Sequence, residues 1–293
     1  MLREFGRYVA DERRTELLAR AVGEVVAYGD VVVDLGAGFG LLALLAARQG
    51  AARVYAIEQG PYLGLAHAIA QDNKLAERII WVEGNSARVV LPELADVIIS
   101  ETLGQLALEE FTVEYLYDAR RRLAKPHARL MPLALRLYLE PLESPGLRAR
   151  WLASYGPQWA DVAGFDLSRL RQAVVANEAL PYIVYDVAEA DKLLGPRTEI
   201  ISFSLGTSQS SKFLRRVACG VELDGQLDAV LATFDAQLSA SVVLSTHPTQ
   251  PRTHWRNVVF PVVPALPVRA GQVVQFEFGF HGTAGWSFAP LSR

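Results

Sequence analysis

The 293-residue chain is poor in the features that mark secreted, disulfide-rich or membrane proteins. Its single cysteine, Cys219, excludes an intrachain disulfide, and we expect a cytoplasmic protein. The longest apolar stretch, Leu35 to Ala47, is shorter than the roughly 18 residues that a transmembrane helix requires. From Met1 to Arg14, charged residues alternate with apolar ones, so this segment lacks the apolar core of a signal peptide. We therefore expect neither secretion nor a membrane anchor.

Charge of one sign is not in excess either. With 29 Lys and Arg against 32 Asp and Glu, the formal net charge is -3. A broad nucleic-acid-binding face normally needs a surplus of basic residues, so we expect no direct nucleic-acid binding, whereas a basic peptide partner is compatible with this charge. Hydrophobic residues make up 51% of the chain and charged residues 21%, which is typical of a compact globular protein, and the length fits two domains.

Segments typical of strands and helices alternate through the first 130 residues. We predict helices over residues 11–28, 41–49, 61–74 and about 109–123, and strands over residues 31–34, 53–58, 79–82 and 96–100. Nearly continuous apolar strands that alternate with helices predict a parallel sheet covered on both faces. The sequence therefore predicts an α/β domain over residues 1–130.

Helical periodicity largely disappears after about Leu130. Short alternating runs take over, for example at residues 199–205, 213–221 and 237–244. Such runs predict a mostly β domain, a sandwich or a barrel, over residues 131–293. One helical insertion is expected between Leu147 and Val175.

A glycine-rich loop lies between the first predicted strand and the next helix. Asp34 is followed by Gly36, Gly38 and Gly40, and glycines at such a turn let the backbone approach a ligand closely. The dinucleotide-binding pattern places its third glycine one residue later, at Leu41, and an acidic residue before the first glycine would repel a pyrophosphate. The loop therefore favours S-adenosylmethionine, which carries no phosphate. An ordinary tight strand-to-helix connection is the alternative.

Glu58 ends the second predicted strand. A carboxylate at this place in an α/β sheet accepts hydrogen bonds from the ribose hydroxyls of a bound nucleoside. Taken alone, Glu58 is equally compatible with a solvated carboxylate at a strand end. Together with the glycine loop it predicts a nucleoside-containing cofactor, namely S-adenosylmethionine.

Three further segments, far apart in the chain, resemble motifs of the protein arginine methyltransferase family. Asp11-Glu12-Arg13-Arg14-Thr15 is similar to the family's D-x-x-R-T helix start, whose arginine binds the carboxylate of the cofactor. Glu101 and Glu110, nine residues apart, resemble the family's double-glutamate hairpin. Thr253-His254-Trp255 resembles the T-H-W loop that lines the pocket for the acceptor arginine, and it is the most specific of the three.

The resemblance spans most of the chain and implies a Rossmann-like methyltransferase domain followed by a β-barrel-like domain that binds the substrate. It implies S-adenosylmethionine as the cofactor, S-adenosylhomocysteine as its product, and no metal. The predicted catalytic residues are Glu101, Glu110, His254 and Asp11, with His254 paired to Asp11. The predicted cofactor-binding residues are Arg14, Asp34, Gly36, Gly38, Gly40, Glu58, Asn85 and Ser86, and the predicted substrate-binding residues are Tyr8, Thr253 and Trp255.

Elementary chemistry agrees with this interpretation of the paired glutamates. A guanidinium is planar and permanently charged, so two groups that only accept hydrogen bonds hold it in a fixed plane. Glu101 follows a central strand, at the edge where open α/β sheets bind ligands. Such a pair would aim one guanidino nitrogen at the methyl group of the cofactor, and proximity and orientation would supply much of the acceleration. Taken alone, each motif also fits surface carboxylates or simple packing.

The chain departs from the family pattern beside the paired glutamates. Thr102 stands where the family has a tryptophan, and Thr112 where a methionine is common, which predicts a wider acceptor pocket. Ala87 stands where the family has an acidic residue that contacts adenine, which leaves Asn85 and Ser86 as candidates.

The chain also departs from the family ahead of the D-x-x-R-T segment, where only Phe5 and Tyr8 are aromatic. We therefore expect the aromatic helix that often covers the cofactor to be largely missing. A bulky Tyr8, three residues before Asp11, favours a monomethylated or symmetrically dimethylated product, because family members place there a side chain that limits the room for a second methyl group. Thr112 and His254 favour the opposite, since the histidine resembles that of the asymmetrically dimethylating members. We expect monomethylation as the major product.

We expect arginine in proteins or peptides as the acceptor. A methyltransferase of a small guanidino or amine metabolite is one alternative, and a catalytically silent binding protein on the same fold is another. An acidic groove leading to the pocket would favour a peptide, an enclosed pocket would favour a metabolite, and turnover of the cofactor would exclude the silent protein.

An insertion at about residues 147–170 stands where the family carries its dimerisation arm. It contains Trp151, Tyr155 and Trp159, which we expect to be exposed in a single chain. Aromatic side chains of this size seldom stay in water without a partner, so the insertion predicts a homodimer.

Overall fold

The computed structural model describes residues 2–155, 157–177 and 182–291, whose contacts group into two compact units. Unit 1 comprises Met1–Leu137, Ile201–Lys212 and Phe234–Trp255, and unit 2 comprises Tyr138–Ile200, Phe213–Thr233 and Arg256–Arg293. The sequence-based division at residue 130 assigns the last two segments of unit 1 to the β domain, and that division stays a prediction.

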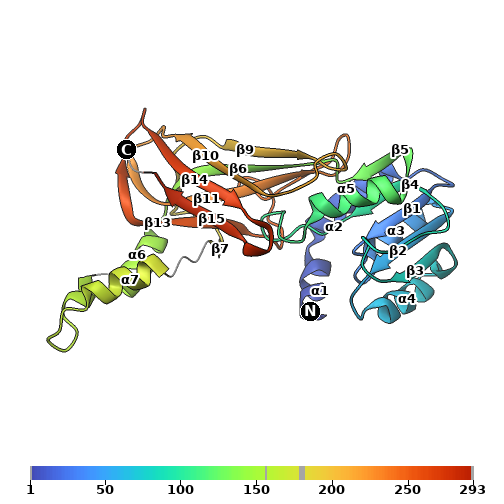
Figure 1. The fold of residues 1–293 in the computed structure, drawn as a ribbon, viewed down its shortest axis with the longest axis horizontal. Coiled ribbons are helices and arrows are strands. Elements are labelled where there is room, and N and C mark those ends of the chain that lie inside the picture. Colours follow the sequence, from blue (N-terminus) through green and yellow to red (C-terminus); the bar gives the residue numbers. More distant parts are fainter. Residues whose placement is uncertain (1, 156, 178–181, 292–293) are drawn as a thin grey trace. The chain divides into compact units, whose positions relative to one another are not determined.

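Unit 1 is built on a five-stranded parallel sheet in the order β3-β2-β1-β4-β5 (Figure 1). Its strands are β1 (Val31–Leu35), β2 (Arg53–Glu58), β3 (Ile79–Glu83), β4 (Ala95–Ser100) and β5 (Ala124–Met131). The parallel sheet that the sequence predicts is confirmed. The strand order reverses at β1 and β4, which lie side by side, and open sheets bind ligands at the carboxyl ends of such a pair.

Helices cover this sheet, whose apolar residues are buried beneath them. They are α1 (Leu2–Ala10), α2 (Glu12–Val25), α3 (Leu41–Gln49), α4 (Leu63–Asp72) and α5 (Thr112–Arg122), with the short helix η1 (Ala76–Arg78) before β3. α3 contacts β1, β2 and β3, α4 contacts β3, and α5 contacts β4 and β5, while α2 packs on α3 and β5. The buried apolar face of α2 includes Leu17, Leu18 and Val22.

The start of α2 is fixed by Asp11, which caps the helix. The Asp11 side chain accepts a hydrogen bond from the backbone N–H of Arg14 at 2.8 Å. Because the first N–H groups of a helix have no partner within it, an aspartate at this position stabilises the helix by about 1 kcal/mol. The cap also sets the direction in which Arg14 leaves the helix.

The second half of the chain is mostly β, as predicted. A seven-stranded sheet contains β6 (Ala134–Glu143), β7 (Ile183–Tyr185), β8 (Lys192–Leu193), β9 (Thr198–Ser204), β11 (Gly225–Gln237), β12 (Val243–Ser245) and β13 (Asn257–Val268). A three-stranded sheet contains β10 (Phe213–Gly220), β14 (Val273–Phe280) and β15 (Trp286–Pro290), with the short helix η3 (Gly282–Ala284) before β15. Within unit 2, Phe260 packs edge to face on Phe278, with ring centroids 4.9 Å apart.

One predicted strand, at residues 237–244, is wrong. β11 ends at Gln237, and a turn follows in which the N–H of Leu238 donates to the carbonyl oxygen of Val242 at 2.9 Å. Only Val243–Ser245 then forms a strand, which pairs with the end of β11. The apolar residues on both sides of the turn mimic one continuous strand in the sequence.

The helical insertion consists of α6 (Pro145–Tyr155), η2 (Pro157–Ala160) and α7 (Ser168–Asn177). Its base is fixed to unit 2 because Arg148 on α6 donates from Nε to Asp228 at 2.8 Å. The prediction of exposed tryptophans needs correction, since Trp151 packs against a buried cluster that includes Leu142, and Trp159 is only partly exposed. The Tyr155 side chain lies outside the described residues. The exposed apolar residues of the insertion are instead Leu152, Val162, Phe165 and Leu170.

No helix in the described part of the chain is long and apolar enough to cross a bilayer.

Candidate functional site

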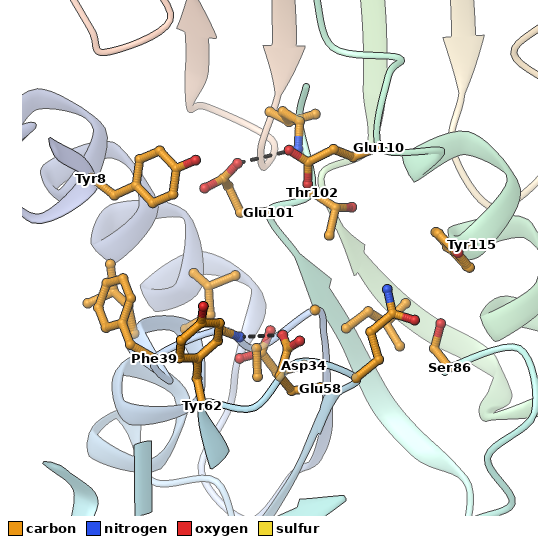
Figure 2. Close-up of a pocket in the computed structure, with 18 of the residues that line it drawn as sticks. Tyr8, Asp34, Phe39, Glu58, Tyr62, Ser86, Glu101, Thr102, Glu110 and Tyr115 are labelled. Carbon is orange, nitrogen blue, oxygen red and sulfur yellow. Dashed lines mark hydrogen bonds between the residues drawn. The ribbon is translucent and has the colours of Figure 1, made fainter. Parts of the chain in front are cut away.

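A cavity of ≈ 620 Å³ opens at the carboxyl ends of β1, β2 and β4, and every residue that lines it belongs to unit 1. Figure 2 shows Asp34 and Glu58 toward one end of this cavity and Glu101 and Glu110 toward the other. Four carboxylates therefore line the cavity, against one guanidinium, that of Arg14. Such a balance favours a ligand with positive charge.

The glycine loop forms the wall next to β1. Gly36, Gly38 and Gly40 have φ angles of 70°, 56° and 92°, which glycine adopts readily and other residues rarely do. At Gly40 space is limiting as well, because a Cβ atom there would lie 2.7 Å from the Trp81 ring. The backbone of the predicted glycines thus forms part of the cavity wall. A larger residue at these positions would strain the backbone or, at Gly40, collide with Trp81.

Glu58, at the end of β2, is held by two backbone N–H groups. Its Oε2 accepts from Gly38 at 2.8 Å, and its Oε1 accepts from Gly60 at 2.5 Å. Each carboxylate oxygen has two lone pairs, so both oxygens retain the capacity to accept from a ligand in the cavity. The strand end and the glycine loop are therefore joined through this one carboxylate.

Asp34 lies inside the cavity wall, almost fully buried, at the end of β1. Neither of its carboxylate oxygens has a hydrogen-bond partner among the described residues. Burial, with a smaller contribution from the negative charges of Glu58 and Glu101, raises the pKa of Asp34 to about 8. The backbone N–H of Ala43 lies near enough to offset part of this rise, although its geometry is not that of a hydrogen bond. A buried carboxylate without a partner is costly, and a cationic ligand would remove that cost.

Arg14 points from α2 toward the same cavity. Its Nε donates to Oε2 of Glu101 at 2.9 Å, and its Nη2 forms an ion pair with the same oxygen. Its Nη1 is buried without a hydrogen-bond partner among the described residues. An unpaired buried donor on a permanent cation marks a place for an anionic group.

Glu101 and Glu110 lie at the two ends of the loop between β4 and α5, and both line the cavity. Glu101 also accepts from the N–H of Leu103 at 3.4 Å. Burial raises the pKa of Glu101, although its contact with Arg14 counteracts this effect. Glu110 is more exposed, whereas its neighbour Glu109 turns into the loop and accepts from the N–H of Leu106 at 2.9 Å.

His254 is brought to Asp11 from the far end of the sequence. Oδ2 of Asp11 lies 2.9 Å from Nδ1 of His254 and accepts from the backbone N–H of the same residue at 2.6 Å. Burial lowers the pKa of His254, and the Asp11 carboxylate only partly compensates. A neutral ring that donates from Nδ1 to Asp11 keeps its other nitrogen, Nε2, as an acceptor.

The other two residues of the T-H-W segment are buried. Thr253 itself does not line the cavity. Trp255 donates from its indole nitrogen to the carbonyl oxygen of Leu103 at 2.9 Å, and Gln105 donates to the carbonyl oxygen of Trp255. The T-H-W segment therefore supports the loop that carries the paired glutamates.

The expectation that an aromatic covering helix is largely missing needs correction. α1 is a helix over Leu2–Ala10, and it carries both Phe5 and Tyr8 to the cavity. Phe5 packs edge to face on Phe39 and Tyr62, with ring centroids 5.2 and 4.9 Å apart. Tyr8 packs against His254 at 4.7 Å, and Figure 2 shows its ring on the Glu101 side of the cavity. Two aromatic residues outside α1 therefore complete the cover.

Asn85 and Ser86 both line the cavity, on the loop after β3. The Asn85 side chain is already engaged, because its amide donates to Gln59 at 3.1 Å and its oxygen accepts from the N–H of Ala87 at 2.9 Å. Tyr115, on α5, lies on the same side of the cavity as Ser86 (Figure 2). The sequence did not identify Tyr115, Phe39 or Tyr62, although Phe39 stands within the glycine loop.

No group of three or more His, Cys, Asp or Glu side chains among the described residues is arranged to hold a metal ion. The site thus offers carboxylates, one arginine, a neutral histidine and backbone N–H groups. These are groups that can bind and orient a cationic ligand and exchange protons with it.

Two family models match the chain. Residues 149–287 match the arginine methyltransferase oligomerization subdomain, and residues 6–125 match the TRM5/TYW2 methyltransferase domain. Among curated proteins, protein arginine N-methyltransferase 1 of Schizosaccharomyces pombe is 28% identical over 251 residues, which cover 84% of this chain and 71% of that protein. Arginine N(omega)-methyltransferase of Streptomyces achromogenes subsp. streptozoticus is 27% identical over 277 residues, covering 92% and 74%.

Solved structures share the fold. The Trypanosoma brucei PRMT1 enzyme-prozyme heterotetrameric complex with AdoHcy matches with a TM-score of 0.82 and 22% identity, covering 98% of this chain and 96% of that chain. The PRMT6-SAH structure matches with a TM-score of 0.78 and 20% identity, covering 100% of both chains. The fold and the site define a methyltransferase with a Rossmann-like domain and a β-rich domain. More narrowly, the matched oligomerization subdomain and the curated relatives support a member of the protein arginine methyltransferase family.

Proposed function

We propose that this protein transfers a methyl group from S-adenosylmethionine to a guanidino nitrogen of arginine. The observation that carries the proposal is the arrangement of Glu101 and Glu110 at one end of a cavity whose other end carries Asp34, Glu58 and the glycine loop. One end suits the acceptor and the other suits the cofactor.

The residues present fit S-adenosylmethionine. The unpaired Nη1 of Arg14 suits the carboxylate of the methionine part, and the unpaired oxygens of Asp34 suit its ammonium group. Glu58, fixed by Gly38 and Gly60, suits the ribose hydroxyls. The bound cofactor supplies an electrophilic methyl group on a positively charged sulfur atom.

The contact between Glu101 and the guanidinium of Arg14 supports a guanidinium-binding role for the acceptor end. With a second carboxylate at Glu110, the site holds an acceptor guanidinium from two sides and fixes its plane. The nitrogen gains the methyl group and loses one proton. We assign that proton first to Glu110, the more exposed of the two carboxylates, and then to water.

His254 contributes by position. As a neutral ring on Asp11, it fixes the start of α2, which carries Arg14, next to the loop of the paired glutamates. Tyr8 packs against His254 and lies 5.5 Å from the Arg14 guanidinium carbon, so it closes the acceptor end. Trp255 supports this end because its indole nitrogen donates to the carbonyl oxygen of Leu103, and Thr253 precedes it in the same buried segment.

Two kinds of acceptor fit this site. Arginine in a protein or peptide is our first candidate, and the Schizosaccharomyces pombe relative is named as a protein arginine methyltransferase. Free arginine or another small guanidino compound is the second, and the Streptomyces relative named arginine N(omega)-methyltransferase favours it specifically. A silent binding protein is the least favoured candidate, because the paired carboxylates and the cofactor end are all present.

The decisive experiment incubates the protein with methyl-labelled S-adenosylmethionine and, in separate reactions, arginine-rich peptides and free arginine. Labelled peptide supports the first candidate, and labelled free arginine alone supports the second. No label on any guanidino acceptor, with cofactor binding intact, contradicts the proposal.

We further propose that the protein acts as a homodimer in the cytoplasm. The exposed Leu152 and Phe165 lie in the helical insertion, and residues 149–287 match an oligomerization subdomain. The cytoplasmic placement rests on the single cysteine, Cys219, which is a buried thiol.

A further inference from the structure

The loop that carries Glu101 and Glu110 is closed at its base by three hydroxyl groups that the proposed chemistry does not use. Ser100 ends β4, Thr102 follows Glu101, and Thr112 begins α5. Thr102 Oγ1 lies 3.1 Å from Ser100 Oγ and 2.9 Å from Thr112 Oγ1. The Thr112 hydroxyl also donates to the carbonyl oxygen of Thr102.

The hydrogen atoms of these hydroxyls all have acceptors, either within the cluster or at the end of β1. Each hydroxyl has one hydrogen to donate. Ser100 donates to the carbonyl oxygen of Leu35, at the end of β1, at 3.0 Å. Since Thr112 donates to the Thr102 carbonyl, the remaining hydrogen, on Thr102, is available to Ser100 or Thr112. The cluster is thus closed on itself, and Thr112 is fully buried, so it does not serve a ligand directly.

The Thr102 side chain also touches the glycine loop. A Cβ atom at Gly36 would lie only 2.6 Å from Cγ2 of Thr102, so the loop backbone passes against this methyl group. Thr102 therefore faces the glycine loop with its methyl group and Thr112 with its hydroxyl. Through Thr102, the start of α5 is connected to the cofactor end of the cavity.

We propose that Thr112 is a positioning residue for methyl transfer. Through Thr102 it holds the two ends of the loop together, and thereby fixes the spacing of Glu101 and Glu110 and their distance from the glycine loop at Gly36. This inference rests on the proposed function. An error of about 1 Å in the placement of reacting groups costs on the order of 100-fold in rate, so a hydroxyl pair at the base of the loop is sufficient to control turnover. Thr112 does not line the cavity, and its effect has to be indirect.

The test replaces Thr112 by Val, which keeps the shape of the side chain and removes the hydroxyl. For Thr112→Val we expect kcat for arginine methylation to fall at least about tenfold, with the Kd of S-adenosylhomocysteine within about twofold of the parent value. Thr112→Ser, which restores the hydroxyl, should return kcat to within about threefold of the parent. Kinetics against arginine-rich peptide or free arginine, with calorimetry for the cofactor product, separate these effects.

A double-mutant cycle adds a second line of proof. Thr102→Val keeps the methyl group against Gly36 and removes the partner hydroxyl, so it should lower kcat by itself. If the pair acts as one unit, the double variant should be hardly worse than either single variant. Thr233→Val is the matched control, because Thr233 is a buried threonine that accepts from Arg197 in unit 2. It should lower the Tm without a matching loss of kcat.

The outcomes are distinct. The inference is overturned if Thr112→Val keeps kcat within threefold of an active parent. It is also overturned if Thr112→Ser loses as much kcat as Thr112→Val, or if the losses of Thr102→Val and Thr112→Val add up in the double variant. If Thr112→Val does not fold, Thr102→Val and Thr112→Ser decide by the same criteria. A parent protein that binds the cofactor product and methylates no guanidino compound contradicts the proposed function instead.

Discussion

Asp11 and His254 lie 243 residues apart in the chain and are joined by two hydrogen bonds, from the His254 backbone N–H and between the side chains. Asp11 also caps α2 through the N–H of Arg14. One carboxylate thus fixes the helix that bears Arg14 and the loop that bears His254. Asp11→Asn keeps the size of the side chain but removes its charge, and we expect kcat to fall about 10- to 100-fold.

His254 gives this contact a pH dependence. Its pKa is lowered mainly by burial, so the folded protein favours the neutral ring. As pH falls below about 6.5, the unfolded chain takes up a proton at this residue before the folded protein does, and stability is lost as pH falls through the lowered pKa. The variant His254→Gln should lose less stability than the parent protein as the pH falls. Thermal unfolding between pH 5 and 8 checks it, and identical profiles for parent and variant would refute the assignment.

Asp34 should make cofactor binding depend on pH. With a pKa of about 8, its carboxyl group is mostly protonated at neutral pH, and a ligand ammonium requires the ionised form. Affinity for S-adenosylhomocysteine should therefore rise between pH 6 and 7.5, by at most about tenfold per pH unit. Asp34→Asn should bind more weakly and without this slope. A flat calorimetric Kd for the parent over this range would contradict the role of Asp34.

The exposed apolar residues of the helical insertion predict the assembly. Leu152 and Phe165 are 55% and 69% exposed in the single chain, which is unusual for side chains of this size. Leu152→Glu with Phe165→Glu should convert a dimer into monomers at micromolar concentration. Light scattering measures this, and Leu223→Glu, an exposed leucine outside the insertion, is the control. If the parent is a monomer, or if the double variant remains a dimer, the exposed residues of the insertion do not mediate assembly.

The product depends on the room beside Tyr8, which packs against His254 at the acceptor end. We expect monomethylarginine as the major product of the parent. Tyr8→Ala removes the ring and should raise the dimethylated fraction several-fold at equal conversion. Mass spectrometry resolves the two products. Predominantly asymmetric dimethylarginine from the parent at low conversion would reverse this prediction.

Local patterns in the sequence were sufficient for much of unit 1. α3 and β2 have the predicted boundaries because Gly40 and Gly50 flank the helix with positive φ angles, and because the apolar interior of the strand lies between the charged residues Arg53 and Glu58. α5 begins at Thr112 rather than near Glu109, since Phe111 has a φ angle of 59°. Helical propensity does not register such a single backbone angle.

Local sequence patterns could not predict the contacts between segments that belong to different elements. The engagement of Asn85 by Gln59, the packing of Phe5 on Tyr62 and the Thr102 to Thr112 contact all depend on where separate elements meet. Motif resemblance nominated the residues of the cavity but not these contacts. The contact between Arg14 and Glu101 is of the same kind, because it joins α2 to the end of β4.

The most direct test compares Glu101→Gln, Glu110→Gln and Glu58→Ala by calorimetric affinity for S-adenosylhomocysteine and by single-turnover methyl transfer to arginine. Glu101→Gln and Glu110→Gln each remove one charge at the acceptor end. Breaking a desolvated ion pair costs about 3–5 kcal/mol, or roughly two to four orders of magnitude in rate, which is the loss expected at the buried Glu101. A smaller loss is expected at Glu110, because this side chain is exposed. Cofactor affinity should change little in Glu110→Gln, and in Glu101→Gln it should change less than the methylation rate, because Glu101 also pairs with Arg14. Glu58→Ala should bind the cofactor product more weakly because its ribose contacts are lost. If Glu101→Gln and Glu110→Gln both methylate arginine within tenfold of the parent rate, the paired carboxylates do not hold the acceptor and the account is contradicted.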